Sequence, residues 1–132
     1  MHGLEFCMIE ALFSQPNYLT AKKTLDAVAL RAEAIYNNLG HLETPGYKRV
    51  DLAPQFEAEL QRACSAGDAP TISSLSPSLA TDEASVAGKD GNSVHLEAEL
   101  MRMSQNAMTH ALETQLVSGT LAKLRLAITG RA

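Results

Sequence analysis

The chain has 132 residues, of which 45% are hydrophobic and 5% aromatic, with no tryptophan and a formal net charge of −4 at pH 7. This length and balance exclude a disordered chain and fit one soluble folded domain, and the dominance of alanine and leucine favours long helices over an aromatic-rich globule. The acidic charge gives no electrostatic support for a nucleic-acid partner, because neutralising phosphates requires clustered Lys and Arg.

Residues 1–15 are expected to form a short amphipathic helix with apolar positions at Leu4, Met8, Ile9, Leu12 and Phe13. This start lacks a basic segment followed by an apolar one, so a cleavable secretory signal is not expected. No apolar run approaches the ~18 residues that would span a bilayer, which predicts no direct insertion into a membrane.

A break is expected at Ser14–Asn17, where Ser14 can cap a new helix and Pro16 falls in its first turn. Apolar residues then recur at alternating steps of three and four, which is the seam of a coiled coil. The seam positions are Tyr18, Ala21, Leu25, Val28, Ala32, Ile35, Leu39 and Leu42.

A turn should end this helix near Leu42. Pro45 disfavours helical geometry at Thr44, and Gly46 supplies the positive φ that a Pro-Gly type II turn needs. Beyond the turn, we expect Asp51 to cap a short helix. Pro54 would occupy an early position in that helix, and its apolar contacts would be made by Phe56 and Leu60.

Residues 65–91 contain many Gly, Pro, Ser, Thr and Asp residues and show no sustained period. Such a composition predicts an irregular segment, disordered in part, with brief extended pieces around Thr71–Ile72 and Ser85–Val86.

The last segment restores the heptad pattern and predicts a helix from Val94 to Ile128. Its seam is Leu96, Leu100, Met103, Ala107, His110, Thr114, Val117, Leu121, Leu124 and Ile128. A second apolar row lies off this seam, at Met101, Met108, Leu112, Leu116 and Leu126. A helix that is apolar on two faces needs more than one neighbour to bury them.

The predicted fold is mainly α-helical. Long N- and C-terminal helices pair as an antiparallel, coiled-coil-like hairpin in which each seam covers the other, with an irregular middle. We divide it into residues 1–43, 44–93 and 94–132, the first and last forming the helical core. The residues predicted to serve helix packing and assembly are Leu25, Val28, Ile35, Leu39, Leu100, Met103, Val117, Leu121, Leu124 and Ile128.

Basic pairs and cysteines give no sign of a functional site. Lys22-Lys23 and Lys48-Arg49 are interpreted as solvated surface. Cys7 and Cys64 have no Cys-x-x-Cys spacing and are interpreted as unpaired small hydrophobes, although a disulfide between them stays open.

Catalytic interpretations find little support. The four histidines share no metal-ligand spacing, and Glu97 and Glu99 point to different sides of a helix. Gly88 and Gly91 are not followed by the Lys-Ser or Lys-Thr of a phosphate-binding loop. The sequence therefore predicts neither an enzyme nor a bound cofactor or metal.

One stretch of the chain contains Asn38-Leu39 and Thr44–Lys48, together with Leu30-Arg31, Asp51, Phe56 and Leu60. It resembles the N-terminal signature of flagellar rod and hook proteins, Asn-Ile-Ala-Asn-x-x-Thr-Pro-Gly-Tyr. Leu39 and Gly40 replace Ile and Ala, and His41 replaces the second Asn. The stretch Asp90–Val94, with Glu97, Glu99, Asn106 and the long last helix, is similar to the C-terminus of the proximal-rod type of this family.

The resemblance implies a structural subunit of the flagellar basal-body rod, which polymerises into a hollow drive-shaft that transmits torque and surrounds the export channel. Its partners would be further copies, neighbouring rod proteins, the membrane (MS) ring, the rod-base adaptor and the flagellar export apparatus. It would reach the periplasmic rod through the flagellar type III system without a cleaved signal peptide. The residues implied to shape the turn by which the chain leaves the inner helix layer are Asn38, Thr44, Pro45, Gly46 and Tyr47.

Two alternatives stay open. Another axial protein of the rod and hook family would share the Thr-Pro-Gly-Tyr turn. A discrete helical-bundle adaptor would instead bind one unrelated partner, or a small ligand between its helices.

Overall fold

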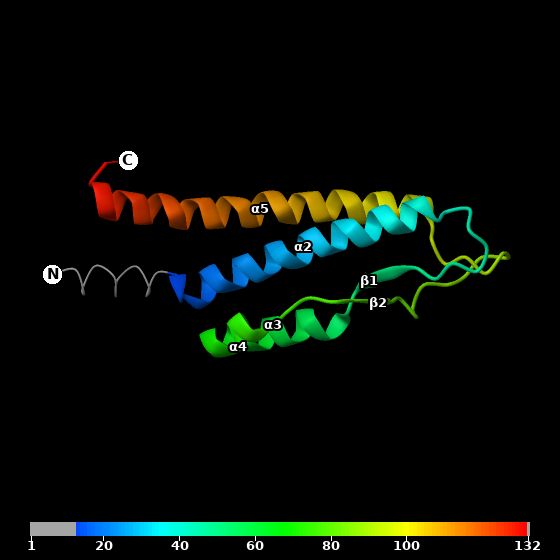
Figure 1. Ribbon diagram of the computed structural model, residues 1–132, viewed down its shortest axis with the longest axis horizontal. Helices are drawn as coiled ribbons and strands as arrows, with labels where there is room; N and C mark the ends of the chain where they lie inside the picture. Colours follow the sequence, from blue (N-terminus) through cyan, green and yellow to red (C-terminus); the bar gives the residue numbers. More distant parts are fainter. Residues whose placement is uncertain (1–12, 132) are drawn as a thin grey trace.

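The computed structural model describes residues 13–131, so Cys7 and residues 1–12 of the predicted first helix lie outside the described residues. Helices α2 (Pro16–Gly40) and α5 (Leu96–Thr129) run antiparallel and side by side over most of the length of the molecule (Figure 1). The predicted helical hairpin is confirmed. In this part of the chain, no helix is long and apolar enough to cross a bilayer.

Helix α2 begins and ends close to the predicted positions. Pro16 occupies its first turn as expected, but the N-cap residue is Gln15 rather than Ser14. The helix ends at Gly40, two residues before Leu42, and Gly46 has the expected positive φ of 74°. Turn chemistry therefore located this end of the hairpin well.

The middle segment is more ordered than predicted. Strand β1 (Val50–Leu52) pairs antiparallel with β2 (Leu79–Thr81), so that Val50 faces Thr81 and Leu52 faces Leu79. The predicted extended pieces were wrong, because Thr71–Ile72 belongs to helix α4 (Ala69–Ser74) and Ser85–Val86 forms no strand. Asp68 caps α4 by accepting a hydrogen bond from the Thr71 N–H, a local signal that a search for apolar periodicity overlooks.

Pro54 lies early in a helix as predicted, since it is the first residue of α3 (Pro54–Ala66). The N-cap is Ala53, so the capping role predicted for Asp51 was wrong. Asp51 lies in β1 instead. The predicted apolar contacts of Phe56 and Leu60 are confirmed, since both side chains are buried. They belong to a cluster that joins α2, β1, α3 and α4, made of Ala27, Leu52, Phe56, Leu60, Ala63 and Ile72.

Helix α2 is the central element, with α5 along one side and α3 and α4 along the other (Figure 1). Burying each large apolar side chain of the α2–α3–α4 cluster contributes roughly 1.5–3 kcal/mol. This cluster holds the middle segment against α2.

The expectation that the two seams cover each other was right only in part for α5, where the seam residues Val117 and Leu124 are half-buried. Its buried residues are Glu99 and Asn106, whereas the predicted seam residues Leu100, Met103 and Leu121 are exposed. The stripe of α5 that faces α2 is thus rotated from the apolar seam, because polar side chains with partners on β1 and α2 occupy the inner positions. Most leucine and methionine side chains of α5 are left facing outward.

Candidate functional site

The residues of the family turn motif meet at the end of the hairpin where α2 and α5 are joined. Asn38 is fully buried at the last turn of α2. Its Nδ2 donates to the Val50 carbonyl at 2.8 Å, and its Oδ1 accepts from the Val50 N–H at 3.0 Å. The Tyr47 hydroxyl donates to the same oxygen at 3.4 Å. One amide therefore fixes the distance between α2 and β1.

The exposed tip of the turn is held by the segment that precedes α5. The Gly46 N–H donates to the Asp90 carbonyl at 3.0 Å. Gly91 has a φ of 81°, and a Cβ on it would lie 3.3 Å from Gly46 Cα, so the two glycines allow a close backbone approach. The rings of His41 and Tyr47 stack at 4.3 Å. The structure thus brings both ends of the family signature together.

Asn92 binds three carbonyl groups of the turn that follows α2. Its Nδ2 donates to the carbonyl oxygens of His41, Leu42 and Thr44 at 2.7, 3.0 and 2.9 Å. These three residues follow Gly40, the last residue of α2, so the buried amide of Asn92 fastens the turn to the segment that precedes α5. The sequence placed Asn92 in the C-terminal signature but predicted no role for it.

A buried charge cluster lies beneath the turn, and the sequence did not reveal it. Arg49, interpreted above as solvated, is only 1% exposed, which corrects that prediction. Its Nε donates to Glu99, which is 0% exposed, and its Nη1 and Nη2 donate to Asp82 and Asp51 at 2.6 and 2.7 Å. Arg102 also donates to Glu99, at 3.2 Å. One guanidinium group therefore joins β1, α5 and the loop after β2.

The charges in this cluster stabilise one another. Burial alone would lower the pKa of Arg49, but its hydrogen bonds to Glu99 and Asp51 and their charges outweigh burial and raise that pKa. Burial alone would raise the pKa of Asp51. The hydrogen bonds from Arg49 and from the Leu52 N–H, with the charge of Arg31, outweigh it and hold that pKa below its ordinary value of 3.8.

This pKa predicts a loss of stability in acid. Since Asp51 is more acidic when folded, its contribution is complete above the unfolded pKa of about 3.9 and disappears as the pH falls through the folded value. We expect the free energy of unfolding to decline below about pH 4, and to decline less steeply in Asp51→Asn. Urea unfolding between neutral pH and acid measures this. Asp26→Asn, an exposed site on α2, is the control, and equal slopes in both variants would contradict the prediction.

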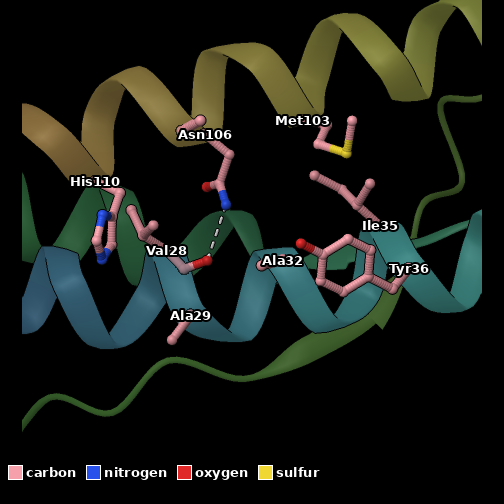
Figure 2. A pocket seen from close by; sticks show the side chains of 9 residues that line it. Val28, Ala29, Ala32, Ile35, Tyr36, Met103, Asn106 and His110 are labelled. Carbon is pink, nitrogen blue, oxygen red and sulfur yellow. Dashed lines mark hydrogen bonds between the residues drawn. The ribbon is translucent and has the colours of Figure 1, made fainter.

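A groove of about 380 Å³ runs between α2 and α5 (Figure 2). Asn106 lines it and donates from Nδ2 to the Val28 carbonyl at 3.0 Å, but its buried Oδ1 has no hydrogen-bond partner among residues 13–131. An unpaired buried acceptor costs roughly 1–3 kcal/mol. The groove is otherwise lined by Val28, Ala29, Ala32, Ile35, Tyr36, Met103, Ala107 and His110.

The residues predicted for packing and assembly divide into two groups. Val28 and Ile35 are buried, and Leu25, Leu39, Val117 and Leu124 are half-buried. Leu100, Met103, Leu121 and Ile128 are exposed in the single chain. An assembly role for the exposed group stays a prediction.

The charge cluster joins β1, α5 and the loop after β2 through ion pairs. Each acidic group in it is bonded to an arginine, and within residues 13–131 no three His, Cys, Asp or Glu side chains are grouped as a metal site would require. Cys64 is half-buried and has no disulfide partner among the described residues. A rigidly fastened turn and a long helical hairpin, with one helix whose apolar side chains are largely exposed, are typical of a structural protein.

Comparison with known proteins agrees with this class. No protein-family model matches the chain. It is 30% identical to the flagellar basal body rod protein FlgB of Borrelia hermsii, over 73% of this chain and 83% of that protein. It is 27% identical to the protein of the same name from Borreliella burgdorferi, over 68% and 78% respectively. The chain belongs to the FlgB family of flagellar basal body rod proteins, which confirms the resemblance found in the sequence.

Proposed function

We propose that this chain is a structural subunit of the proximal rod of a bacterial flagellum, where it polymerises with neighbouring rod proteins around the export channel. The proposal depends on the exposure of many apolar side chains on the outer surface of α5, in a chain that belongs to this family. Its exposed apolar side chains are Leu96, Leu100, Met101, Met103, Met108, Leu112, Leu116, Leu121, Leu126 and Ile128. A helix that is apolar on several sides is normally buried among neighbours.

The hairpin is suited to transmit torque because its joined end is cross-linked by side chains. Asn38, Asn92 and Arg49 connect α2, the turn, β1 and the start of α5 through hydrogen bonds and ion pairs. Such a network resists a change in the angle between elements, since moving any one breaks several buried bonds. Asn38 and Thr44–Tyr47 thereby shape the turn by which the chain leaves the axial helices.

The proposal places the protein in the periplasmic part of the basal body, next to the membrane (MS) ring and the rod-base adaptor. The chain reaches that position through the flagellar type III export apparatus. The resemblance supports this location.

Basal bodies isolated from cells test the function. Mass spectrometry should find the chain in purified basal bodies, and deletion of its gene should leave cells with a membrane ring but no rod and no swimming. Cells that still build rods without it, or basal bodies that lack it, would refute the proposal and favour an adaptor with another partner.

A further inference from the structure

Two apolar surfaces of α5 lie on opposite sides of that helix. The first, which we term the ridge, is Met101, Met108, Leu112 and Leu116, and these side chains are 65%, 71%, 58% and 55% exposed. Their spacings of seven, four and four residues place them on one face. The ridge is uncovered by the rest of residues 13–131.

The second surface is the groove between α2 and α5. Figure 2 shows its two walls, with Met103, Asn106 and His110 on α5 facing Val28, Ala32 and Tyr36 on α2. Leu112 lies nine positions after Met103, which is about two and a half turns of an α-helix. The groove and the ridge therefore face in opposite directions from the same stretch of α5.

The two surfaces match in chemistry. Neither the ridge nor the lining of the groove contains Asp, Glu, Lys or Arg, so their contact would desolvate no permanent charge. Asn106 lines the groove, and its buried Oδ1 is a hydrogen-bond acceptor without a partner among the described residues. Gln105, exposed on α5 between Met101 and Met108, carries an amide that can donate to such an acceptor.

We propose that the ridge of one copy of this chain packs into the groove of the next copy, so that α5 of each subunit lies between two neighbours. The inference rests on the proposed function and specifies the contact between like subunits. Because the ridge and the groove occupy the same length of α5, neighbouring copies lie side by side with little shift along the helix axis. A contact between two different surfaces repeats around a ring or helical path instead of closing as a dimer.

Cysteine cross-linking in assembled basal bodies tests this contact. In a chain with Cys7→Ser and Cys64→Ser, Ala29→Cys marks the groove and Leu112→Cys marks the ridge. Basal bodies carrying both new cysteines are treated with a short bifunctional maleimide and analysed by denaturing electrophoresis. We expect a ladder of dimers, trimers and longer products of this chain, and monomers only from either single-cysteine chain.

The outcomes separate this inference from the proposed function. A chain that is present in basal bodies but gives no ladder would overturn the ridge-and-groove contact and leave the rod assignment standing. Dimers from Ala29→Cys alone would also overturn it, because they require two grooves to meet. A chain absent from basal bodies refutes both proposals.

A charge placed on the ridge provides an independent measurement. Leu112→Glu should lower the amount of chain in basal bodies by at least about tenfold, because a carboxylate would be buried in an apolar groove without a partner. Ala111→Glu is the matched control, since it introduces the same charge at the preceding exposed position, off the ridge. Circular dichroism of both purified variants verifies that the hairpin forms. Equal incorporation of the two variants would contradict the contact.

Discussion

Replacing Glu99 with glutamine should lower the free energy of unfolding by about 3 kcal/mol, at the lower end of the 3–5 kcal/mol that follows loss of one partner of a buried ion pair. Glu99 is fully buried and accepts hydrogen bonds from Arg49, Arg102 and Asn38. Glutamine keeps the shape but removes the charge. Arg49 would then remain buried with only Asp51 and Asp82 as counter-charges.

Urea unfolding followed by circular dichroism measures this effect, with the slope of the transition used to verify that the denatured state is unchanged. Glu97→Gln is the matched control, because Glu97 lies two residues earlier on α5 and is exposed. It should change the free energy of unfolding by less than about 0.5 kcal/mol. A Glu99→Gln variant as stable as this control would show that the charge cluster does not hold the hairpin together.

The long helices could be predicted from the sequence because their signals are local. Heptad spacing identified both, and the Pro45-Gly46 turn located the end of α2 to within two residues. The capped start of α4 was also present as a signal, in Asp68 followed by Pro70, but six residues are too few to show a period. Strands β1 and β2 have three residues each and depend on their pairing with one another.

The charge cluster could not be predicted in the same way, because it depends on contacts between distant residues. Arg49 and Glu99 are separated by 50 positions, and a search for apolar periodicity assigns polar residues to the surface. Glu99 and Asn106 lie seven residues apart, one full heptad, so they share a face of α5. The seven-residue spacing of Glu99 and Asn106 was the available sequence signal that this face of α5 packs against polar groups.

Asn38→Leu should destabilise the fold by about 2–5 kcal/mol, since each buried polar group left without a partner costs roughly 1–3 kcal/mol. The Asn38 amide bonds both the N–H and the carbonyl of Val50, and leucine can bond neither. Amide hydrogen exchange at Val50 should accelerate, because its N–H loses its acceptor.

Asn37→Leu is the control for Asn38→Leu, because Asn37 precedes it on α2 and its side chain is exposed. We expect Asn37→Leu to unfold within about 0.5 kcal/mol of the unmodified chain. Asn38→Asp separates the two halves of the amide. It keeps an acceptor for the Val50 N–H but loses the donor, and it brings a second carboxylate to the position 3.3 Å from Glu99 Oε2. It should therefore be destabilised at neutral pH and recover part of its stability as acid protonates the new carboxylate, whereas Asn38→Leu should not recover. If Asn38→Leu unfolds like its control, the bonds between α2 and β1 do not set the geometry of the turn.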